Sequence, residues 1–279
     1  MKKVLITGAA GMLAPYLIHS AQKSNVVVTT ARKNGDVACN LSDEKSVKKM
    51  LKEVDPDWVI HAAALSSVEL CEENPELADQ SNRVNTENIA RNLKKHTRLV
   101  FISTDQVYPD LPGPHIEQDV GPVNMYGRTK LSGEQAALKH HETLVIRTNM
   151  FGKSLTKGRA SIDDFVVNSL KNGDKITLFS DISFSPLHMR TISNIIMEML
   201  QKEILGVFNI GCRDGMSKSD FGLAIAKKRG LSVETVKIGE SDSIKGRVQR
   251  PHDMRLDVSR LENVLHLKMP TLLEEIAKL

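Results

Sequence analysis

The chain has few aromatic residues, few cysteines and no long apolar segment. Only 4% of its 279 residues are aromatic, and no stretch approaches the roughly 20 apolar residues that a membrane span needs. Cys39, Cys71 and Cys212 are odd in number and widely spaced, which indicates neither a disulfide framework nor a zinc site. The apolar run after Met1-Lys2-Lys3 is too short for a secretory signal. We therefore expect a cytoplasmic protein that contacts no membrane.

The chain also lacks a strong charge of either sign. Its 38 basic and 34 acidic residues leave a formal charge of +4, spread along the sequence. This balance argues against a nucleic-acid surface, although it suits a cleft that receives phosphates. Hydrophobic residues at 41% and charged residues at 26% are typical of a globular protein, and the length suits one large α/β domain or two small ones.

The first half alternates short apolar runs with amphipathic segments, a pattern typical of consecutive βαβ units and a parallel sheet. We expect strands at 3–7, 26–30, 57–61, 98–103 and 143–148. Helices are expected between them, at 11–23, 43–54, 75–95 and 126–140. The predicted fold class is α/β, with a doubly wound parallel sheet covered on both faces.

Beyond about residue 150 the pattern loosens. We expect helices at 160–172, 190–202, 217–229 and 258–265, and strands at 176–179 and 206–210. No long flexible linker separates this part from the first half. We therefore predict one domain over residues 1–279, in which residues from about 150 onward form a small α/β substrate-binding lobe beside the carboxyl ends of the strands.

Two glycines three residues apart, Gly8 and Gly11, follow the first expected strand directly. At a strand-to-helix turn, glycine lets backbone N–H groups and the helix N-terminus approach a phosphate closely. The spacing is G-x-x-G-x-x-A, one residue longer than the first step of the G-x-G-x-x-G dinucleotide motif. A tight turn that binds no ligand is the alternative explanation.

The second expected strand ends in Thr29-Thr30-Ala31-Arg32-Lys33, with no carboxylate before Asp36. An acidic residue at this place binds the ribose diol of NAD, whereas arginine accommodates the 2′-phosphate of NADP. Arg32 and Lys33 therefore favour NADPH, with NADH as the second choice. A solvated pair of charges at a strand end is the alternative.

Tyr126 and Lys130 lie four residues apart, which places both side chains on one face of a helix. A tyrosine is a weak acid at neutral pH, and a neighbouring ammonium brings its pKa nearer the working range. The same spacing also occurs by chance in many helices. Its significance here comes from Thr104, at the end of an apolar strand upstream, which can polarise a substrate carbonyl beside Tyr126.

Further residues can complete such a site. Asp105 can orient a substrate hydroxyl or cap the following turn. The small side chains after His61 leave room for a flat cofactor. Asn85 is polar on the buried face of a helix, where asparagine is mildly unfavourable, and it could brace the site through backbone hydrogen bonds.

The ordered motifs TGAAGMLA, HAAA, VNTENIARNL, FISTDQVY, NMYGRTKLSGE and VIRTNMFG resemble those of the extended short-chain dehydrogenases. Within that superfamily the chain is most similar to the dTDP-4-dehydrorhamnose reductases, and the resemblance continues through SDISFSPLHMRTISNIIMEML, GVFNIGCRDGMSKSDFGLAIA and RPHDMRLDVSRLE. These enzymes transfer hydride from NADPH or NADH to the C4 keto group of a nucleotide-linked deoxyhexulose.

The resemblance implies roles for individual residues. Tyr126 would donate the proton, Lys130 would lower its pKa and bind the nicotinamide ribose, and Thr104 would hold the carbonyl oxygen. The other expected cofactor-binding residues are Gly8, Gly11, Met12, Leu13, Arg32, Asn40, Leu41, Ala62, Ala63, Ala64, Asn85 and Ser103. The expected substrate-binding residues are Thr104, Asp105, Asn149 and Arg250. Arg250 is a candidate for the substrate diphosphate or for a structural ion pair.

The chain departs from the family pattern in the substrate half of the site. Asn149 and Met150 stand where relatives carry a serine and a tryptophan that lines the nucleotide-sugar pocket. Asn40 replaces an aspartate and His61 an asparagine. Where relatives can carry a glutamate used in metal-linked dimerisation, this chain has Pro15-Tyr16-Leu17, so we predict no metal. A homodimer remains open.

We therefore predict an oxidoreductase that reduces a 4-keto-6-deoxy nucleotide-sugar, most simply dTDP-4-dehydrorhamnose to dTDP-L-rhamnose, for cell-surface polysaccharide. One alternative is an epimerase or dehydratase on the same scaffold, although a dehydratase would carry Asp-Glu where this chain has Asp105-Gln106. Another alternative is a non-catalytic NADP-binding regulatory subunit. The intact Thr104, Tyr126 and Lys130 argue against it.

Overall fold

A computed structural model describes residues 1–32 and 35–279 of the chain. Its centre is a seven-stranded sheet in the order β11-β6-β5-β4-β1-β2-β3, in which every neighbouring pair is parallel. The strands are β1 (Lys3–Thr7), β2 (Val26–Ala31), β3 (Val37–Ala38), β4 (Trp58–His61), β5 (Arg98–Ile102), β6 (Thr143–Thr148) and β11 (Gly206–Ile210). The chain builds the sheet outward from β1 in both directions. This arrangement confirms the predicted doubly wound, Rossmann-type α/β fold.

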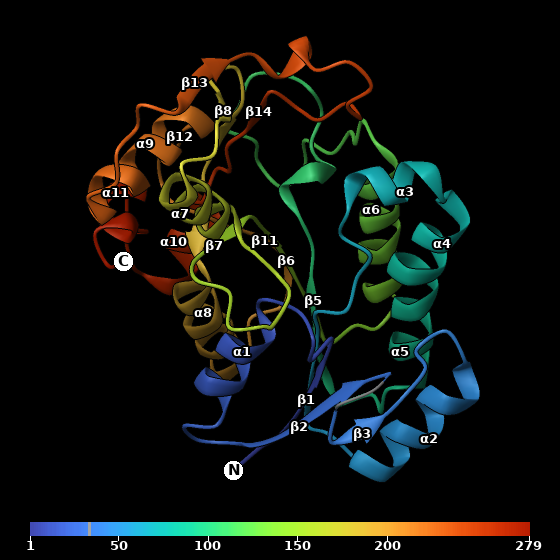
Figure 1. Cartoon of the computed structure of the whole chain (residues 1–279). Coiled ribbons are helices and arrows are strands. Elements are labelled where there is room, and N and C mark those ends of the chain that lie inside the picture. Colours follow the sequence, from blue (N-terminus) through green and yellow to red (C-terminus); the bar gives the residue numbers. More distant parts are fainter. Residues whose placement is uncertain (33–34) are drawn as a thin grey trace.

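Helices cover both faces of this sheet (Figure 1). On one face α1 packs against α8, and on the other α5 packs against α2 and α6. Their bounds are α1 (Ala14–Ala21), α2 (Glu44–Val54), α5 (Asn85–Asn92), α6 (Met125–Ala137) and α8 (Met189–Gln201). With both faces covered, β4 and β6 are buried along their whole length, which explains why their sequences are apolar runs rather than alternating patterns.

Apart from β11 and α8, the residues beyond β6 form short strands and helices in the upper left part of the molecule in Figure 1. Three small sheets have the orders β10-β7, β12-β9-β14 and β13-β8. Their strands are β7 (Met150–Phe151), β8 (Ile176–Phe179), β9 (Ser183–Phe184), β10 (Leu187–His188), β12 (Met216–Ser217), β13 (Val236–Gly239) and β14 (Asp253–Met254). The helices are α7 (Ile162–Asn172), α9 (Lys218–Arg229), α10 (Ser259–Leu265) and α11 (Leu272–Ile276).

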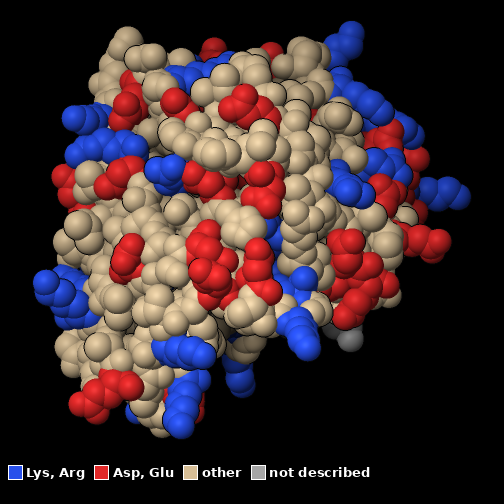
Figure 2. Space-filling model, turned by 90° about the horizontal axis from the view of Figure 1, so that it is seen from above, with Lys and Arg blue, Asp and Glu red and all other residues tan. Residues whose placement is uncertain are grey.

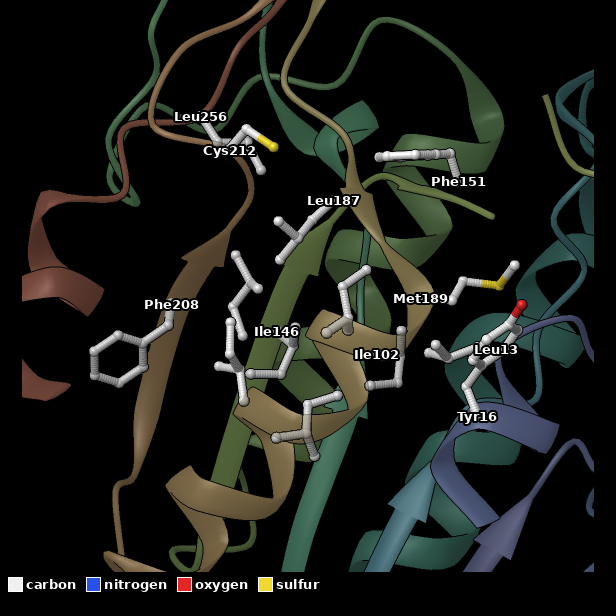
Figure 3. Close-up of a cluster of buried hydrophobic side chains, with 14 of the residues drawn as sticks. Leu13, Tyr16, Ile102, Ile146, Phe151, Leu187, Met189, Phe208, Cys212 and Leu256 are labelled. Atoms are coloured by element: carbon white, nitrogen blue, oxygen red, sulfur yellow. The ribbon is translucent and has the colours of Figure 1, made fainter. Parts of the chain in front are cut away.

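One buried cluster joins the sheet to this later part of the chain. Figure 3 shows Ile102 and Ile146 from the central sheet packed near Leu187 and Met189, which come from beyond residue 150. Leu13 and Tyr16, at the start of α1, lie at the edge of the same cluster. Burial of each such side chain contributes about 1.5–3 kcal/mol. The cluster therefore fixes the start of α1 relative to the C-terminal residues.

Two predicted helices differ from the structure. The helix expected at 11–23 begins only at Ala14, because Gly11 to Leu13 belong to the preceding turn and Pro15 occupies the first helical turn. The helix expected at 75–95 is a succession of three segments, which are α4 (Pro75–Asp79), a π-helical turn (Gln80–Val84) and α5. A short helix before it, α3 (Val68–Glu73), was not predicted. Within the described ranges, no helix is both long and apolar enough to cross a membrane.

Candidate active site

A cleft of about 1000 Å³ opens at the carboxyl ends of the central strands, where ligands bind in open α/β sheets. Most of the predicted site residues line it together. They are Gly8, Gly11, Met12, Leu13, Arg32, Leu41, Ala62, Ala63, Ala64, Asn85, Ser103, Thr104, Asp105, Tyr126, Lys130 and Asn149. The sequence therefore located the cleft correctly, while the role of each residue stays a prediction.

The loop between β1 and α1 is tight and close to the neighbouring strand. Gly8 has a φ of +76°, and a Cβ there would lie 2.7 Å from the backbone nitrogen of Ala63. The Gly11 N–H donates to the Gly8 carbonyl at 2.7 Å. A side chain at Gly8 would therefore both strain the backbone and collide with the cleft wall. The turn leaves a space bounded by backbone at the start of a helix, which fits a pyrophosphate.

His61 stabilises the wall opposite this loop. Its Nδ1 lies 2.7 Å from Thr7 Oγ1 and its Nε2 lies 3.1 Å from Thr86 Oγ1. The Thr7 hydroxyl also accepts a hydrogen bond from the Ala63 N–H at 3.3 Å. Burial, with a smaller contribution from the charge of Lys130, lowers the pKa of His61 to about 3. The ring is therefore neutral at working pH and acts as a structural link between β1, β4 and the following helix.

Tyr126 and Lys130 lie in the first half of α6, which begins at a cap where Asn124 Oδ1 accepts from the Gly127 N–H at 2.9 Å. Lys130 Nζ donates to the Ile102 carbonyl at 2.6 Å and lies 4.1 Å from the centre of the Phe101 ring. Burial lowers the pKa of Lys130 to about 7, against the opposing effect of nearby Glu134. The ammonium thus loses its charge within the physiological pH range.

Tyr126 is protonated in its buried environment. Burial is the largest cause that raises its pKa, and an interaction with Thr104 opposes this rise. Its phenol is therefore protonated at neutral pH. The same Thr104 hydroxyl donates to Asp105 Oδ1 at 3.1 Å and accepts from the Gln106 N–H at 3.2 Å. Thr104 and Tyr126 both face the cleft, as the sequence predicts.

Asp105 and Asn149 contact each other at the substrate end of the cleft. The Asn149 amide nitrogen donates to Asp105 Oδ2 at 2.6 Å. Burial raises the pKa of Asp105 to about 6, although its hydrogen bonds with Asn149 and Thr104 and the charge of Lys218 act in the opposite direction. The two predicted substrate-binding residues are therefore one hydrogen-bonded unit, joined across 44 positions of sequence.

Beneath the catalytic helix lies a buried ion pair that the sequence did not reveal. Glu134 accepts from Arg147 Nη2 at 2.6 Å and from Arg147 Nε at 3.0 and 3.2 Å. It also accepts a short hydrogen bond from Ser103 Oγ. Ser103 lines the cleft, but its hydroxyl is already engaged. The pair ties α6 to β6 directly behind Lys130.

The bracing role predicted for Asn85 belongs to Asn82. Asn85 Oδ1 accepts from the Ser42 hydroxyl at 3.0 Å and makes no backbone hydrogen bond among the described residues. Asn82, in the π-helical turn, accepts from the Leu65 N–H at 2.9 Å and donates to the Leu65 carbonyl at 3.1 Å. It also donates to Thr129 Oγ1 at 3.0 Å. Both asparagines are buried, but only Asn82, three residues earlier and within the π-helical turn, bonds the backbone that follows β4.

Two predicted site residues do not line the cleft. Asn40 is exposed and its Oδ1 accepts from the Ser42 N–H, so its neighbours Cys39 and Leu41 form the wall instead. Arg250 donates to the Val248 carbonyl at 3.1 Å and pairs closely with Glu69. The structure therefore shows Arg250 in the ion pair that was one of its two predicted roles.

At the end of β2, Arg32 lines the cleft, whereas Lys33 lies outside the described residues. Asp36, the next carboxylate along the chain, turns back to β2. Its Oδ2 accepts from the backbone N–H and the hydroxyl of Thr29, both at 2.8 Å. These bonds lower the pKa of Asp36. Its carboxylate is therefore committed to Thr29 rather than to a ribose.

Sequence reasoning missed several cleft residues. Gln106 lines the cleft, but its Oε1 accepts from the Asn124 amide at 3.0 Å. Arg159, from the segment between β7 and α7, also lines the cleft. It lies 29 residues beyond Lys130 in a segment without periodicity, so no local signal could reveal it.

Another cluster has the donor set for a metal but lies outside the cleft. Asp181, Asp242 and His252 bring ligand atoms within 4.8 Å of one another. None of the three lines the cleft. That the protein uses no metal stays a prediction.

The fold and the cleft define a Rossmann-type α/β protein of the extended short-chain dehydrogenase class. A family model described as the RmlD substrate binding domain matches residues 1–279. The chain belongs to this family, that of the dTDP-4-dehydrorhamnose reductases, which confirms the resemblance inferred from the motifs.

Individual relatives span nearly the whole chain. A probable low-salt glycan biosynthesis reductase of Haloferax volcanii is 26% identical over 287 residues, which cover 98% of this chain and 96% of that protein. Methionine adenosyltransferase 2 subunit beta of Xenopus laevis is also 26% identical, over 94% of this chain and 82% of that protein. The crystal structure of a dTDP-4-dehydrorhamnose reductase from Clostridium acetobutylicum superimposes with a TM-score of 0.90 at 26% identity, covering 99% and 97% of the two chains.

Proposed function

We propose that this protein is an NAD(P)H-dependent reductase of a 4-keto-6-deoxy nucleotide-sugar, with dTDP-4-dehydrorhamnose, reduced to dTDP-L-rhamnose for cell-surface polysaccharide, as its leading substrate. The observation that carries the proposal is the meeting of Thr104, Tyr126 and Lys130 in the same cleft as the glycine turn at Gly8 and Gly11. Family membership and the reductases among the relatives support it.

The cofactor, when bound, would supply a hydride to the keto carbon of the substrate. The Thr104 hydroxyl, which donates to Asp105 Oδ1 in this structure, would exchange that acceptor for the carbonyl oxygen of the substrate. Tyr126 then transfers its phenolic proton to the same oxygen, which completes the alcohol. Lys130 stabilises the phenolate left on Tyr126 through its positive charge. The Asp105–Asn149 unit orients a sugar hydroxyl at the same end of the cleft.

We assign Arg32 to the 2′-phosphate of NADPH, because Arg32 lines the cleft at the end of β2, whereas Asp36 does not line it and is hydrogen-bonded through Oδ2 to Thr29. The expected preference is NADPH, with NADH as an alternative. Arg32→Ala should therefore raise the Kd of NADPH while leaving that of NADH nearly unchanged. Equal effects on both cofactors would contradict this assignment.

The proposal includes a cytoplasmic location and no nucleic-acid or membrane partner. Figure 2 shows basic and acidic side chains interspersed over the face it presents, rather than gathered by sign. The oligomeric state, monomer or homodimer, does not enter the chemistry. A dehydratase is disfavoured because Gln106, next to Asp105, is a neutral amide fixed by Asn124.

The test is oxidation of NADPH, followed at 340 nm, with 4-keto-6-deoxy sugars carried on dTDP, GDP, UDP and CDP. Reaction with one of them identifies the nucleotide and the reaction together. Tyr126→Phe should lower turnover about 100-fold, as expected for a lost general acid, with cofactor affinity nearly intact. Unchanged turnover would refute the assigned role of Tyr126.

The second candidate is a regulatory subunit, favoured by the likeness to methionine adenosyltransferase 2 subunit beta. Such a protein has no chemical need for Thr104, Tyr126 and Lys130 together. Binding of NADPH without oxidation by any keto-sugar nucleotide would favour this candidate over the reductase.

A further inference from the structure

The segment between β7 and α7, residues 152–161, is attached at several points to the rest of the protein. The Tyr16 hydroxyl donates to the Lys153 carbonyl at 2.6 Å. The backbone N–H groups of Gly152 and Ser154 donate, at 2.7 Å each, to the carboxylates of Asp163 and Asp164. In Figure 1 this yellow-green segment runs close to α1. Its conformation is therefore set by contacts at its beginning and at the start of α7.

The middle of the segment is hydrogen-bonded to the glycine turn. Thr156 Oγ1 donates to the Gly11 carbonyl at 3.1 Å. Three residues later, the Arg159 N–H donates to the Thr156 carbonyl at 3.2 Å and closes a turn. This turn brings Arg159 to the cleft, where it is a lining residue together with Gly8 and Gly11.

Among the described residues, Arg159 is one of three basic residues that line the cleft, with Arg32 and Lys130. Arg32 follows β2, and the Lys130 ammonium donates to the Ile102 carbonyl beside Tyr126. In the part of the chain that the structure describes, the Arg159 guanidinium makes no ion pair or hydrogen bond. Arg159 is exposed and lines the same cleft as Gly8 and Gly11, and an arginine with such freedom is suited to bind an anion there.

A pyrophosphate bound at the glycine turn would need a positive side chain to balance its charge. A helix N-terminus offers a partial charge of about +0.5, and Pro15 in the first turn of α1 has no N–H to donate. A pyrophosphate carries a negative charge on each phosphate, which exceeds what this terminus can balance. The planar fork of arginine can contact oxygens of both phosphates at once.

We propose that Arg159 binds the pyrophosphate of the dinucleotide cofactor and thereby joins the 152–161 segment to the cofactor. The proposal rests on the cofactor half of the proposed function and is independent of the sugar substrate. Because NADPH and NADH share the pyrophosphate, Arg159 contributes equally to the affinity for both, in contrast to Arg32.

The test compares Arg159→Ala with Lys157→Ala, a change of an exposed basic residue in the same segment that does not line the cleft. The Kd of NADPH and of NADH is measured by cofactor fluorescence, without any sugar nucleotide. Arg159→Ala should raise both Kd values by roughly 10- to 100-fold, as expected for a lost charge-assisted contact. Arg159→Lys should give an intermediate loss, and Lys157→Ala less than about a twofold change.

Other binding results would overturn the assignment of Arg159, the proposed function or both. Unchanged Kd values in Arg159→Ala would overturn the assignment of Arg159 while leaving the proposed function standing. A loss restricted to NADPH would place Arg159 at the 2′-phosphate and also overturn the assignment. Failure of the unaltered protein to bind either cofactor would overturn this proposal and the proposed function together. A failure to reduce keto-sugars despite tight NADPH binding would overturn only the latter.

Discussion

Replacing Glu134 by glutamine should destabilise the protein strongly. The Glu134 and Arg147 side chains are only 2% and 4% exposed, and three N–H···O contacts join them. Glutamine has the same shape but no charge and only one acceptor oxygen. The buried guanidinium would therefore lose its counter-charge, and its other partners, the Tyr108 hydroxyl at 3.2 Å and the Glu117 carbonyl at 2.6 Å, are uncharged. Breaking a buried pair on one side costs about 3–5 kcal/mol, a large part of a typical stability of about 5–15 kcal/mol.

The assay is equilibrium unfolding in urea, followed by fluorescence of Trp58, the single tryptophan, which is buried in β4. With an m-value of about 3 kcal/mol per M, the midpoint should fall by about 1–2 M. The matched control is Glu198→Gln, which breaks an exposed pair with Lys202 on α8 and should cost less than about 0.5 kcal/mol. Equal midpoints for the two variants would refute the reasoning.

A double variant distinguishes two causes of the lost stability: an unbalanced buried charge and missing hydrogen bonds. When Glu134→Leu is combined with Arg147→Met, neither charge is left buried without its partner. Replacing both members of a buried ion pair by apolar residues often leaves the stability unchanged or raises it. The double variant should therefore be more stable than Glu134→Gln. If it is less stable, the hydrogen bonds to Ser103 and Tyr108, rather than the buried charge, hold this region together.

Three more predictions concern Lys130, Gly127 and His252. Because Lys130 has a pKa near 7 and is charged below it, kcat/KM for NADPH should fall as pH rises above about 7, and a flat profile from pH 6 to 9 would contradict this. In Gly127→Ala, the new Cβ would collide with the Gln106 carbonyl. The free energy of unfolding should therefore fall by roughly 1–3 kcal/mol, and turnover should fall as well; thermal melting and rate measurements check both. The Asp110 carboxylate raises the pKa of His252, which Asp181 and Asp242 also face. The positive charge of His252 therefore stabilises the fold below pH 6.5, and this stabilisation is lost as pH rises through the raised pKa. His252→Gln should lower the melting temperature more at pH 5.5 than at pH 9.

The central sheet could be predicted because each of its long strands carries its own signal. The residues of β1 and β6 are apolar or β-branched runs bounded by polar segments, and the structure places both strands at the predicted positions. Strands such as β7 and β10 have two residues each. A two-residue strand has no periodicity, and it exists only because the fold brings a partner from 37 positions away. Local sequence patterns cannot predict such strand pairs.

The cleft shows the same limit. The glycine turn and the Tyr126–Lys130 pair are local patterns, so the sequence could place them. Asn82 was not predicted as a site residue, because the π-helical turn that contains it changes the helical periodicity that the prediction assumed. Glu134 gave no signal, since a glutamate on an amphipathic helix is usually exposed. Its burial depends on Arg147 arriving from β6.

The pairing of Asp105 with Asn149 bears on one departure of this chain from the family pattern. The family pattern has serine where this chain has Asn149, and an amide reaches Asp105 with a nitrogen donor at 2.6 Å. That contact occupies Oδ2, while Oδ1 accepts from Thr104. The carboxylate is therefore held by both neighbours before any substrate enters, and a sugar hydroxyl would meet a fixed acceptor rather than a mobile one. Asn149→Ser should then cost affinity for the sugar rather than for the cofactor, because Asn149 supports the substrate end of the cleft and leaves the glycine turn untouched. A raised Kd for NADPH with an unchanged KM for the sugar nucleotide would contradict this division of the site.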